Sequence, residues 1–264
     1  MTDKNIWENM LQVAEAAARE AGAFQKLKWA TEFHVEFKSE INLVTEVDKA
    51  SEQMIIAKIV ANFPDHDVLA EEGFGHRKDS IYKWIIDPLD GTTNFAHGYP
   101  LWCVSIALEC QGQIILGVVY DPLKDEMFKA VRGSGAFLNG RSIQVSQHEV
   151  LSKALMATGF AYNVRETSNN NLAQFGNMLL KAQSVRRDGV AALDLCYVAC
   201  GRYDGYWELN LFPWDMAAGL LIVEEAGGLV TKYNGAPFSV YDKEICATNG
   251  GIHEQVLTVI NQTV

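Results

Sequence analysis

The stretch WIIDPLDGTTNFAHGYP, residues 84–100, places two acidic residues around a proline, directly after a short apolar run. Asp87 follows the apolar run, Asp90 comes three residues later, and Pro88 stiffens the backbone between them. An extended chain that begins to turn can bring both carboxylates to one side. Two close carboxylates repel each other unless they share a proton or a cation. The stretch therefore predicts a site for a hard divalent cation, of which Mg²⁺ is the simplest choice.

Gly91, Thr92 and Thr93 follow the second acid and indicate an anion site beside the metal site. Glycine permits close approach of the backbone, and threonine is typical of a helix start. The free N–H groups at a helix N-terminus suit a phosphate group. An alternative stays open, because two acids three residues apart near a turn are also common as turn and cap residues.

Further acids occur where other predicted elements meet. Glu71 and Glu72 follow the apolar residues 68–70, and Asp215 follows a predicted strand and begins a predicted helix. Acids at the ends of three strands can converge on one crevice, which strengthens the metal prediction. The alternatives are a solvated loop acid for Glu71 and a helix cap for Asp215.

Composition excludes several classes of partner. The chain has 264 residues, is 48% hydrophobic and carries a net charge of −11, which disfavours nucleic-acid and anionic-membrane surfaces. The first twenty residues lack the apolar segment of a secretory signal, and no apolar run reaches the ~18 residues of a membrane span. Five cysteines without framework spacing indicate reduced thiols. We therefore expect a cytoplasmic protein with no membrane or nucleic-acid partner.

Apolar spacing predicts two kinds of region along the chain. Helices are predicted at 5–25, 49–63, 170–182, 191–200 and 215–226. Strands are predicted at 68–70, 84–86, 104–109, 114–120, 126–131, 135–138, 184–186 and 203–208, with two short extended pieces within 35–48. Consecutive central strands favour an antiparallel sheet, and the later alternation of strand and helix favours a second sheet covered by helices. We predict an α/β fold of two sheets layered with helices.

Two long stretches resemble the signatures of the inositol monophosphatase family, within the Mg²⁺-dependent, Li⁺-sensitive phosphatases. Residues 84–98, WIIDPLDGTTNFAHG, are similar to the first signature, and residues 214–228, WDMAAGLLIVEEAGG, to the second. LAEEG (69–73), LVTEVD (43–48) and the segment 117–140 are similar to further parts of the family, in order. The resemblance implies a layered αβαβα sandwich and a homodimer. It also implies one domain over 1–264, with a metal half (1–150) and a substrate half (151–264).

The resemblance implies two to three Mg²⁺ ions. Glu71, Asp87 and the Leu89 carbonyl would hold the first ion. Asp87, Asp90 and Asp215 would hold the second, and Glu71 would help to hold a weaker third. Such ions lower the pKa of a bound water and neutralise phosphoryl oxygens. They also reverse the local field, so that an acidic protein can attract an anionic substrate.

The family's catalytic and substrate residues carry over to named positions. Thr92 and Asp48 match the pair that orients the attacking water, and each can also cap a helix. The implied catalytic residues are Thr92, Asp48 and Glu71. The implied substrate contacts are Leu89, Asp90, Gly91, Thr92, Thr93, Arg186, Gly189, Val190, Ala191, Glu208 and Asp215.

The residues that would contact the alcohol portion of the substrate leave the most alternatives open. Residues 189–191 match the segment that contacts the inositol ring, and Glu208 matches the acid that accepts hydroxyl hydrogen bonds. Val190 stands where some relatives carry a hydroxyl residue, so its ring contact is open. Arg186 either reaches substrate or pairs with Asp188 or Asp215. By the resemblance Lys38 would lie on a loop near the site, and its role is open.

The leading hypothesis is Mg²⁺-dependent hydrolysis of myo-inositol monophosphate by an activated water. Fructose 1,6-bisphosphate, histidinol phosphate and adenosine 3′,5′-bisphosphate are alternative substrates for the same metal site. A different class of alternative is a regulatory binding protein, because some bacterial members of the family act in a transcription complex. The resemblance further implies inhibition by Li⁺, of a strength that the sequence does not give.

Overall fold

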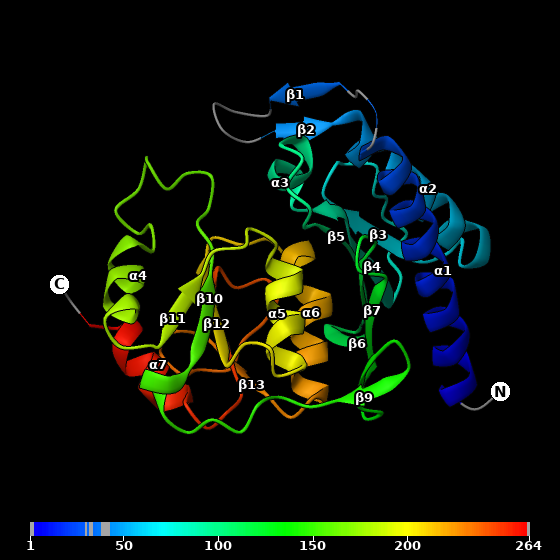
Figure 1. Cartoon of the computed structure of the whole chain (residues 1–264). Helices are drawn as coiled ribbons and strands as arrows, with labels where there is room; N and C mark the ends of the chain where they lie inside the picture. Colours follow the sequence, from blue (N-terminus) through cyan, green and yellow to red (C-terminus); the bar gives the residue numbers. More distant parts are fainter. Residues whose placement is uncertain (1–2, 30, 32–33, 38–42, 263–264) are drawn as a thin grey trace.

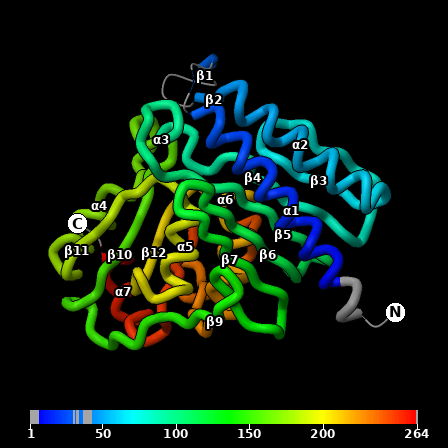
Figure 2. The backbone as a smooth tube through the Cα atoms, turned by 45° about the vertical axis from the view of Figure 1, so that its right-hand side comes forward, coloured from blue at the N-terminus to red at the C-terminus, as the bar shows by residue number. Residues whose placement is uncertain are grey.

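Five layers of alternating helices and sheets make up the protein (Figures 1 and 2). The computed structural model describes residues 3–29, 31, 34–37 and 43–262, so Lys38 lies outside the described residues. The helices are α1 (Asp3–Trp29), α2 (Glu46–Asn62), α3 (Thr92–Ala96), α4 (Leu172–Leu179), α5 (Ala191–Ala199), α6 (Pro213–Glu225) and α7 (His253–Ile260), with a 3₁₀ turn at Leu151–Lys153. Across the described ranges, no helix combines the length and the apolarity needed to cross a membrane.

Six of the helices given above occupy three of the five layers. Helices α1 and α2 cover the outer face of the first sheet, α5 and α6 lie between the two sheets, and α4 and α7 cover the outer face of the second sheet (Figure 1). The predicted layered sandwich is confirmed. Helix α4 is shorter than its predicted range of 170–182, and α7 was not predicted.

The first sheet has seven strands in the order β3-β4-β5-β6-β7-β8-β9. Its strands are β3 (Asp67–Ala70), β4 (Tyr82–Asp90), β5 (Cys103–Cys110), β6 (Gln113–Asp121), β7 (Glu126–Val131), β8 (Ala136–Leu138) and β9 (Arg141–Ile143). Only β3 and β4 pair in parallel, so the predicted antiparallel character of the sheet is confirmed. Strands β1 (Val35–Phe37) and β2 (Leu43–Thr45) form a separate antiparallel pair, which agrees with the two extended pieces predicted there.

The second sheet has five strands in the order β11-β10-β12-β14-β13. Its strands are β10 (Leu155–Thr158), β11 (Ser184–Arg186), β12 (Gly205–Leu209), β13 (Leu229–Thr231) and β14 (Glu244–Thr248). Strand β10 runs parallel to both β11 and β12, and the other pairs are antiparallel. The sequence predicted this sheet from β11 and β12 alone.

Strand β4 does not end at Ile86 as predicted, but continues to Asp90 through a bulge. Its pairing with β5 shifts register between Asp87 and Asp90, where Pro88 has no N–H to give to the ladder. Side chains alternate along a regular strand, so residues three apart point to opposite faces. One extra residue in the bulge reverses that parity. The bulge therefore explains how both acids can serve one site.

Two glycines set how closely helix α6 approaches its neighbours. A Cβ added to Gly117 in β6 would lie 2.7 Å from the Ala218 carbonyl oxygen and 3.0 Å from the Ala218 Cα. A Cβ added to Gly219 would lie 2.6 Å from the Leu195 Cβ in α5. The backbone of α6 therefore lies against the sheet on one side and against α5 on the other. Since Asp215 lies in the first turn of α6, these contacts fix its distance from β4.

The Gly117 contact predicts a large cost for the smallest possible side chain. Gly117→Ala is expected to lower the free energy of unfolding by roughly 1–3 kcal/mol, because the new methyl group meets helix backbone and not a movable side chain. Chemical denaturation measures this difference. Gly176→Ala in the exposed helix α4 is the control, since its Cβ would meet nothing within 4 Å. Equal losses in the two variants would contradict the assignment.

Candidate functional site

Four carboxylates from three parts of the chain share one partly buried place. Glu71 follows β3, Asp87 and Asp90 lie in β4, and Asp215 lies in the first turn of α6. Asp87 is 2% exposed, and its pKa is raised well above the usual value by burial and by the charges of the other three. We call Glu71, Asp87, Asp90 and Asp215 the acid cluster. The structure thus brings together all four predicted carboxylate ligands.

Burial raises the pKa values of three acids of the cluster, and repulsion by neighbouring acids adds to the effect. Burial raises the pKa of Asp90 well above its usual value, and the charge of Asp215 adds to the effect. Burial also raises the pKa of Asp215 to about 7, while the Phe212 N–H opposes the shift. Asp87, Asp90 and Asp215 would each hold a proton at a pH where an exposed carboxyl is ionised.

In three of these acids, one carboxylate oxygen accepts a hydrogen bond from a backbone N–H group. The Leu89 N–H donates to Asp87 Oδ1 at 2.9 Å, the Ala192 N–H to Asp90 Oδ2 at 2.7 Å, and the Phe212 N–H to Asp215 Oδ2 at 2.7 Å. The three donors come from β4, from the first turn of α5 and from the residue before α6. These bonds fix the direction of each carboxylate before any ligand is present.

The donor set fits a hard cation by its chemistry. Within the described part of the chain, no three Asp, Glu, His or Cys side chains are already arranged around a common metal position. The groups that meet here are nevertheless carboxylates that raise one another's pKa, with the backbone of Leu89 among them. Oxygen ligands of this kind are those that Mg²⁺ prefers, and a divalent cation would balance the repulsion. The residues therefore fit the predicted metal.

Helix α3 begins beside the acid cluster, where the sequence predicted an anion cradle. Gly91 precedes the helix with a φ of 100°, and a Cβ there would lie 2.9 Å from Val190 Cγ2. Both the backbone conformation and the close contact therefore require glycine. Thr92 and Thr93 begin the helix, so their N–H groups have no intrahelical partner.

Thr92 and Asp48 form the pair that the sequence predicted. Thr92 Oγ1 lies 2.8 Å from Asp48 Oδ1 and 3.1 Å from the Leu89 carbonyl oxygen. The other Asp48 oxygen accepts a hydrogen bond from the hydroxyl of Thr45, which caps α2. Burial raises the pKa of Asp48 to about 6, and the hydrogen bonds from Thr45 and Thr92 oppose the shift. Because the Thr92 hydroxyl donates its hydrogen bond to Asp48, its oxygen lone pairs can accept a hydrogen bond from a water molecule.

Glu208 lies in β12, near the acid cluster and on the second sheet. It is 7% exposed, and its Oε2 accepts a hydrogen bond from the Tyr206 hydroxyl. Burial raises its pKa to about 7, while Tyr206 and the charge of Arg187 oppose the shift. Its own charge raises the pKa of both Asp90 and Asp215. A buried hydrogen-bond acceptor therefore stands beside the predicted metal ligands.

The arginine that acts on Glu208 is Arg187, which the sequence analysis did not select. Arg186 is exposed, and its Nη1 donates to Ser184 Oγ at 2.7 Å. A Cβ added to Gly189 would lie 2.8 Å from Arg187 Nη1, so the guanidinium group of Arg187 packs against Gly189. Arg186 ends β11 and Arg187 follows it, and two adjacent arginines cannot be told apart in the sequence without the strand's register. The substrate contact proposed for Arg186 stays a prediction.

Tyr162 is a second residue that the sequence analysis missed. It belongs to the polar segment 161–171 between β10 and α4, and 47% of its surface is exposed. Burial and the charges of three members of the acid cluster raise its pKa, while a hydrogen bond with the Thr93 side chain opposes the shift. A tyrosine in a polar loop gives no signal that points to a site.

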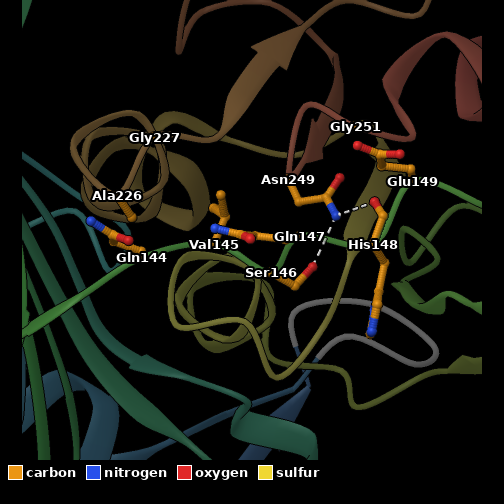
Figure 3. Close-up of a pocket in the computed structure, with 10 residues that line it drawn as sticks. All are labelled: Gln144, Val145, Ser146, Gln147, His148, Glu149, Ala226, Gly227, Asn249 and Gly251. Atoms are coloured by element: carbon orange, nitrogen blue, oxygen red, sulfur yellow. Dashed lines mark hydrogen bonds between the residues drawn. The ribbon is translucent and has the colours of Figure 1, made fainter.

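A cavity of about 470 Å³ lies elsewhere, and no member of the acid cluster lines it (Figure 3). Its lining residues are Gln144, Val145, Ser146, Gln147, His148, Glu149, Ala226, Gly227, Asn249 and Gly251. Ser146 Oγ and His148 Nδ1 lie 2.5 and 2.8 Å from the same oxygen of Asp204. The hydroxyl therefore bonds the carboxylate and not the imidazole, so a Ser-His-Asp relay is not formed. Asn249 Nδ2 donates hydrogen bonds to Ser146 Oγ and to the His148 carbonyl oxygen, which connects this segment to the end of β14 in the second sheet.

Known proteins resemble this chain over nearly its whole length. The model of the inositol monophosphatase family matches residues 6–264. An inositol-1-monophosphatase from Synechocystis sp. is 46% identical over 264 residues, covering 99% of this chain and 91% of that protein. A protein named Nus factor SuhB from Pseudomonas aeruginosa is 43% identical over 258 residues, covering 95% of each. The solved structure of an inositol monophosphatase from Anabaena (Nostoc) sp. is 46% identical with a TM-score of 0.90, covering 98% of this chain and 97% of that one.

The repulsion within the acid cluster predicts that losing a charge stabilises the metal-free protein. Asp90→Asn is expected to raise the free energy of unfolding at pH 8 by about 1 kcal/mol in the presence of a chelator. Stability should rise because the raised pKa of Asp90 means that ionising this group costs more free energy in the folded state than in the unfolded state. The gain should shrink at pH 5, where the folded protein keeps this proton.

Asp204→Asn is the matched control for that measurement. Asp204 accepts hydrogen bonds from Ser146, His148 and the Leu155 N–H, so its charge is well solvated by the protein. The same substitution should therefore destabilise the protein here. A loss of stability in both variants would show that Asp90 is not under repulsion.

Proposed function

This chain belongs to the inositol monophosphatase family and is a phosphatase, and from that premise we propose that it hydrolyses the phosphate monoester of a polyhydroxylated ring, with myo-inositol monophosphate as the leading substrate. One observation carries the choice of substrate. Glu208 is a buried carboxylate whose charge acts on Asp90 and Asp215. A carboxylate accepts hydrogen bonds from hydroxyl groups, so a hydroxyl acceptor stands beside the acids that face the phosphate.

In this proposal the acid cluster and the Leu89 carbonyl hold two to three Mg²⁺ ions. The chemistry that Mg²⁺ supplies when bound is a lower pKa for the attacking water and neutralisation of the phosphoryl oxygens. Support comes from the raised pKa values of the buried acids, which a divalent cation would lower again.

The remaining roles belong to groups of the chain itself. The Thr92 hydroxyl donates a hydrogen bond to Asp48. The same hydroxyl accepts a hydrogen bond from the attacking water, which holds that water in place. The N–H groups at the start of α3 bind phosphate oxygens, and Gly91 allows the phosphate to approach them. Glu208 binds ring hydroxyls, and Arg187 stands near it over Gly189. The water is thus oriented by groups on α2 and α3, and the alcohol is recognised by groups on or next to the second sheet.

Phosphate release from a panel of monoesters tests the proposal. We expect myo-inositol monophosphate to give a higher kcat/KM than fructose 1,6-bisphosphate, histidinol phosphate or adenosine 3′,5′-bisphosphate. Activity should disappear with a chelator and return with Mg²⁺. Full activity without a divalent cation would contradict the metal assignment. A different preferred monoester would replace the substrate and leave the phosphatase assignment in place.

Glu208→Gln tests the hydroxyl contact alone. The variant keeps the shape of the side chain and loses its charge, so recognition of ring hydroxyls should weaken by roughly 1–3 kcal/mol. p-Nitrophenyl phosphate has no ring hydroxyls and should be hydrolysed nearly as before. The measurement is the ratio of kcat/KM for myo-inositol monophosphate to that for p-nitrophenyl phosphate. An unchanged ratio would remove Glu208 from the substrate site.

A further inference from the structure

The Glu208 carboxylate occupies the place where a side chain on residue 159 would stand. A Cβ added to Gly159 would lie 2.1 Å from Glu208 Oε2 and 2.4 Å from its Cδ and Oε1. Strand pairing explains the contact. Thr158 lies opposite Trp207 in the parallel β10–β12 pair, so the next residues on each strand, Gly159 and Glu208, are neighbours. Even an alanine side chain cannot share this space with the carboxylate.

Backbone conformation gives no reason for a glycine here. Gly159 is absent from the residues with positive φ, so an alanine could adopt its backbone angles. Twelve other glycines of the chain do have positive φ. The space that Glu208 occupies is therefore what glycine supplies at this position.

The backbone at Gly159 is tied in place by buried side chains. The Thr158 hydroxyl donates to the Trp207 carbonyl oxygen at 2.5 Å. Asn171 Nδ2 donates at 2.8 Å to both Thr158 Oγ1 and the Gly159 carbonyl oxygen, and the Trp207 indole N–H donates to Asn171 Oδ1 at 2.7 Å. Thr158 and Asn171 are 0% and 2% exposed. A new methyl group on Gly159 would therefore displace the Glu208 carboxylate and not the strand.

We propose that Gly159 is a specificity-determining residue, because its missing side chain sets where the Glu208 carboxylate stands toward the alcohol portion of the substrate. This inference rests on the proposed function. A side chain at 159 forces the carboxylate away from the Tyr206 hydroxyl that holds it. The Thr92–Asp48 pair lies on other elements and keeps its place. Substitution at 159 therefore changes which alcohol is recognised and leaves phosphoryl transfer intact.

The test compares Gly159→Ala with the wild type on two substrates. The ratio of kcat/KM for myo-inositol monophosphate to that for p-nitrophenyl phosphate is expected to fall about fivefold or more, as for loss of a charge-assisted hydrogen bond. The value for p-nitrophenyl phosphate should stay within about twofold, which also shows that the variant folds. Gly176→Ala makes the same chemical change in open space and should leave the ratio unchanged.

A double-mutant cycle shows whether Gly159 acts through Glu208. In a Glu208→Ala background the collision is gone, so adding Gly159→Ala should not change the ratio further. The inference is overturned by an unchanged ratio in Gly159→Ala, by equal losses on both substrates, or by a further fall in the Glu208→Ala background. A wild type that does not hydrolyse myo-inositol monophosphate overturns the proposed substrate instead. The same ratios are then measured with the hydroxylated monoester that the panel selects.

Discussion

Repulsion between buried carboxylates is the constraint on which much of this structure depends. Four acids share one place, and the charges of their neighbours add to burial in making the ionisation of Asp87 and Asp90 less favourable. The bulge in β4 brings two of them together, and backbone N–H groups of Leu89, Ala192 and Phe212 orient three. Those donors belong to the first sheet and to the starts of α5 and α6. The central helix layer must therefore lie in register with the first sheet to within a hydrogen-bond length, because a small shift would leave an acid both charged and unbound.

Missing side chains set much of that register. Gly117 lets α6 rest on β6, and Gly219 lets α5 rest on α6. Gly91 lets the start of α3 approach Val190 before α5, and Gly159 leaves room for Glu208 between β10 and β12. Each contact lies between elements that are far apart in the sequence. Because the nearest atoms are backbone or tightly packed side chains, a single methyl group is enough to disturb them.

What the sequence predicted, and what it did not, follows from the range of each interaction. Helices with a clear apolar period and strands between glycine turns were found, and so were the four acids, because these signals are local. The bulge in β4 was missed, since it exists only through pairing with β5. The short strand β10 carries no period of its own and is defined by parallel neighbours. For the same reason the sequence gave no sign that Arg187 acts on Glu208 or that Gly159 faces Glu208.

The same difference in range explains why the reaction is easier to infer from this chain than the substrate. In the proposed assignment, most groups that handle the phosphate lie within one continuous stretch, from Asp87 to Thr93, and three further acids come to them. Such a stretch is visible as a pattern in the sequence. The groups that face the alcohol come from β12 and from the segment before α5. Their arrangement depends on how the second sheet pairs, so under the proposal above specificity changes through positions such as 159 that act on Glu208. A site divided in this way can keep its hydrolytic chemistry while its alcohol preference changes.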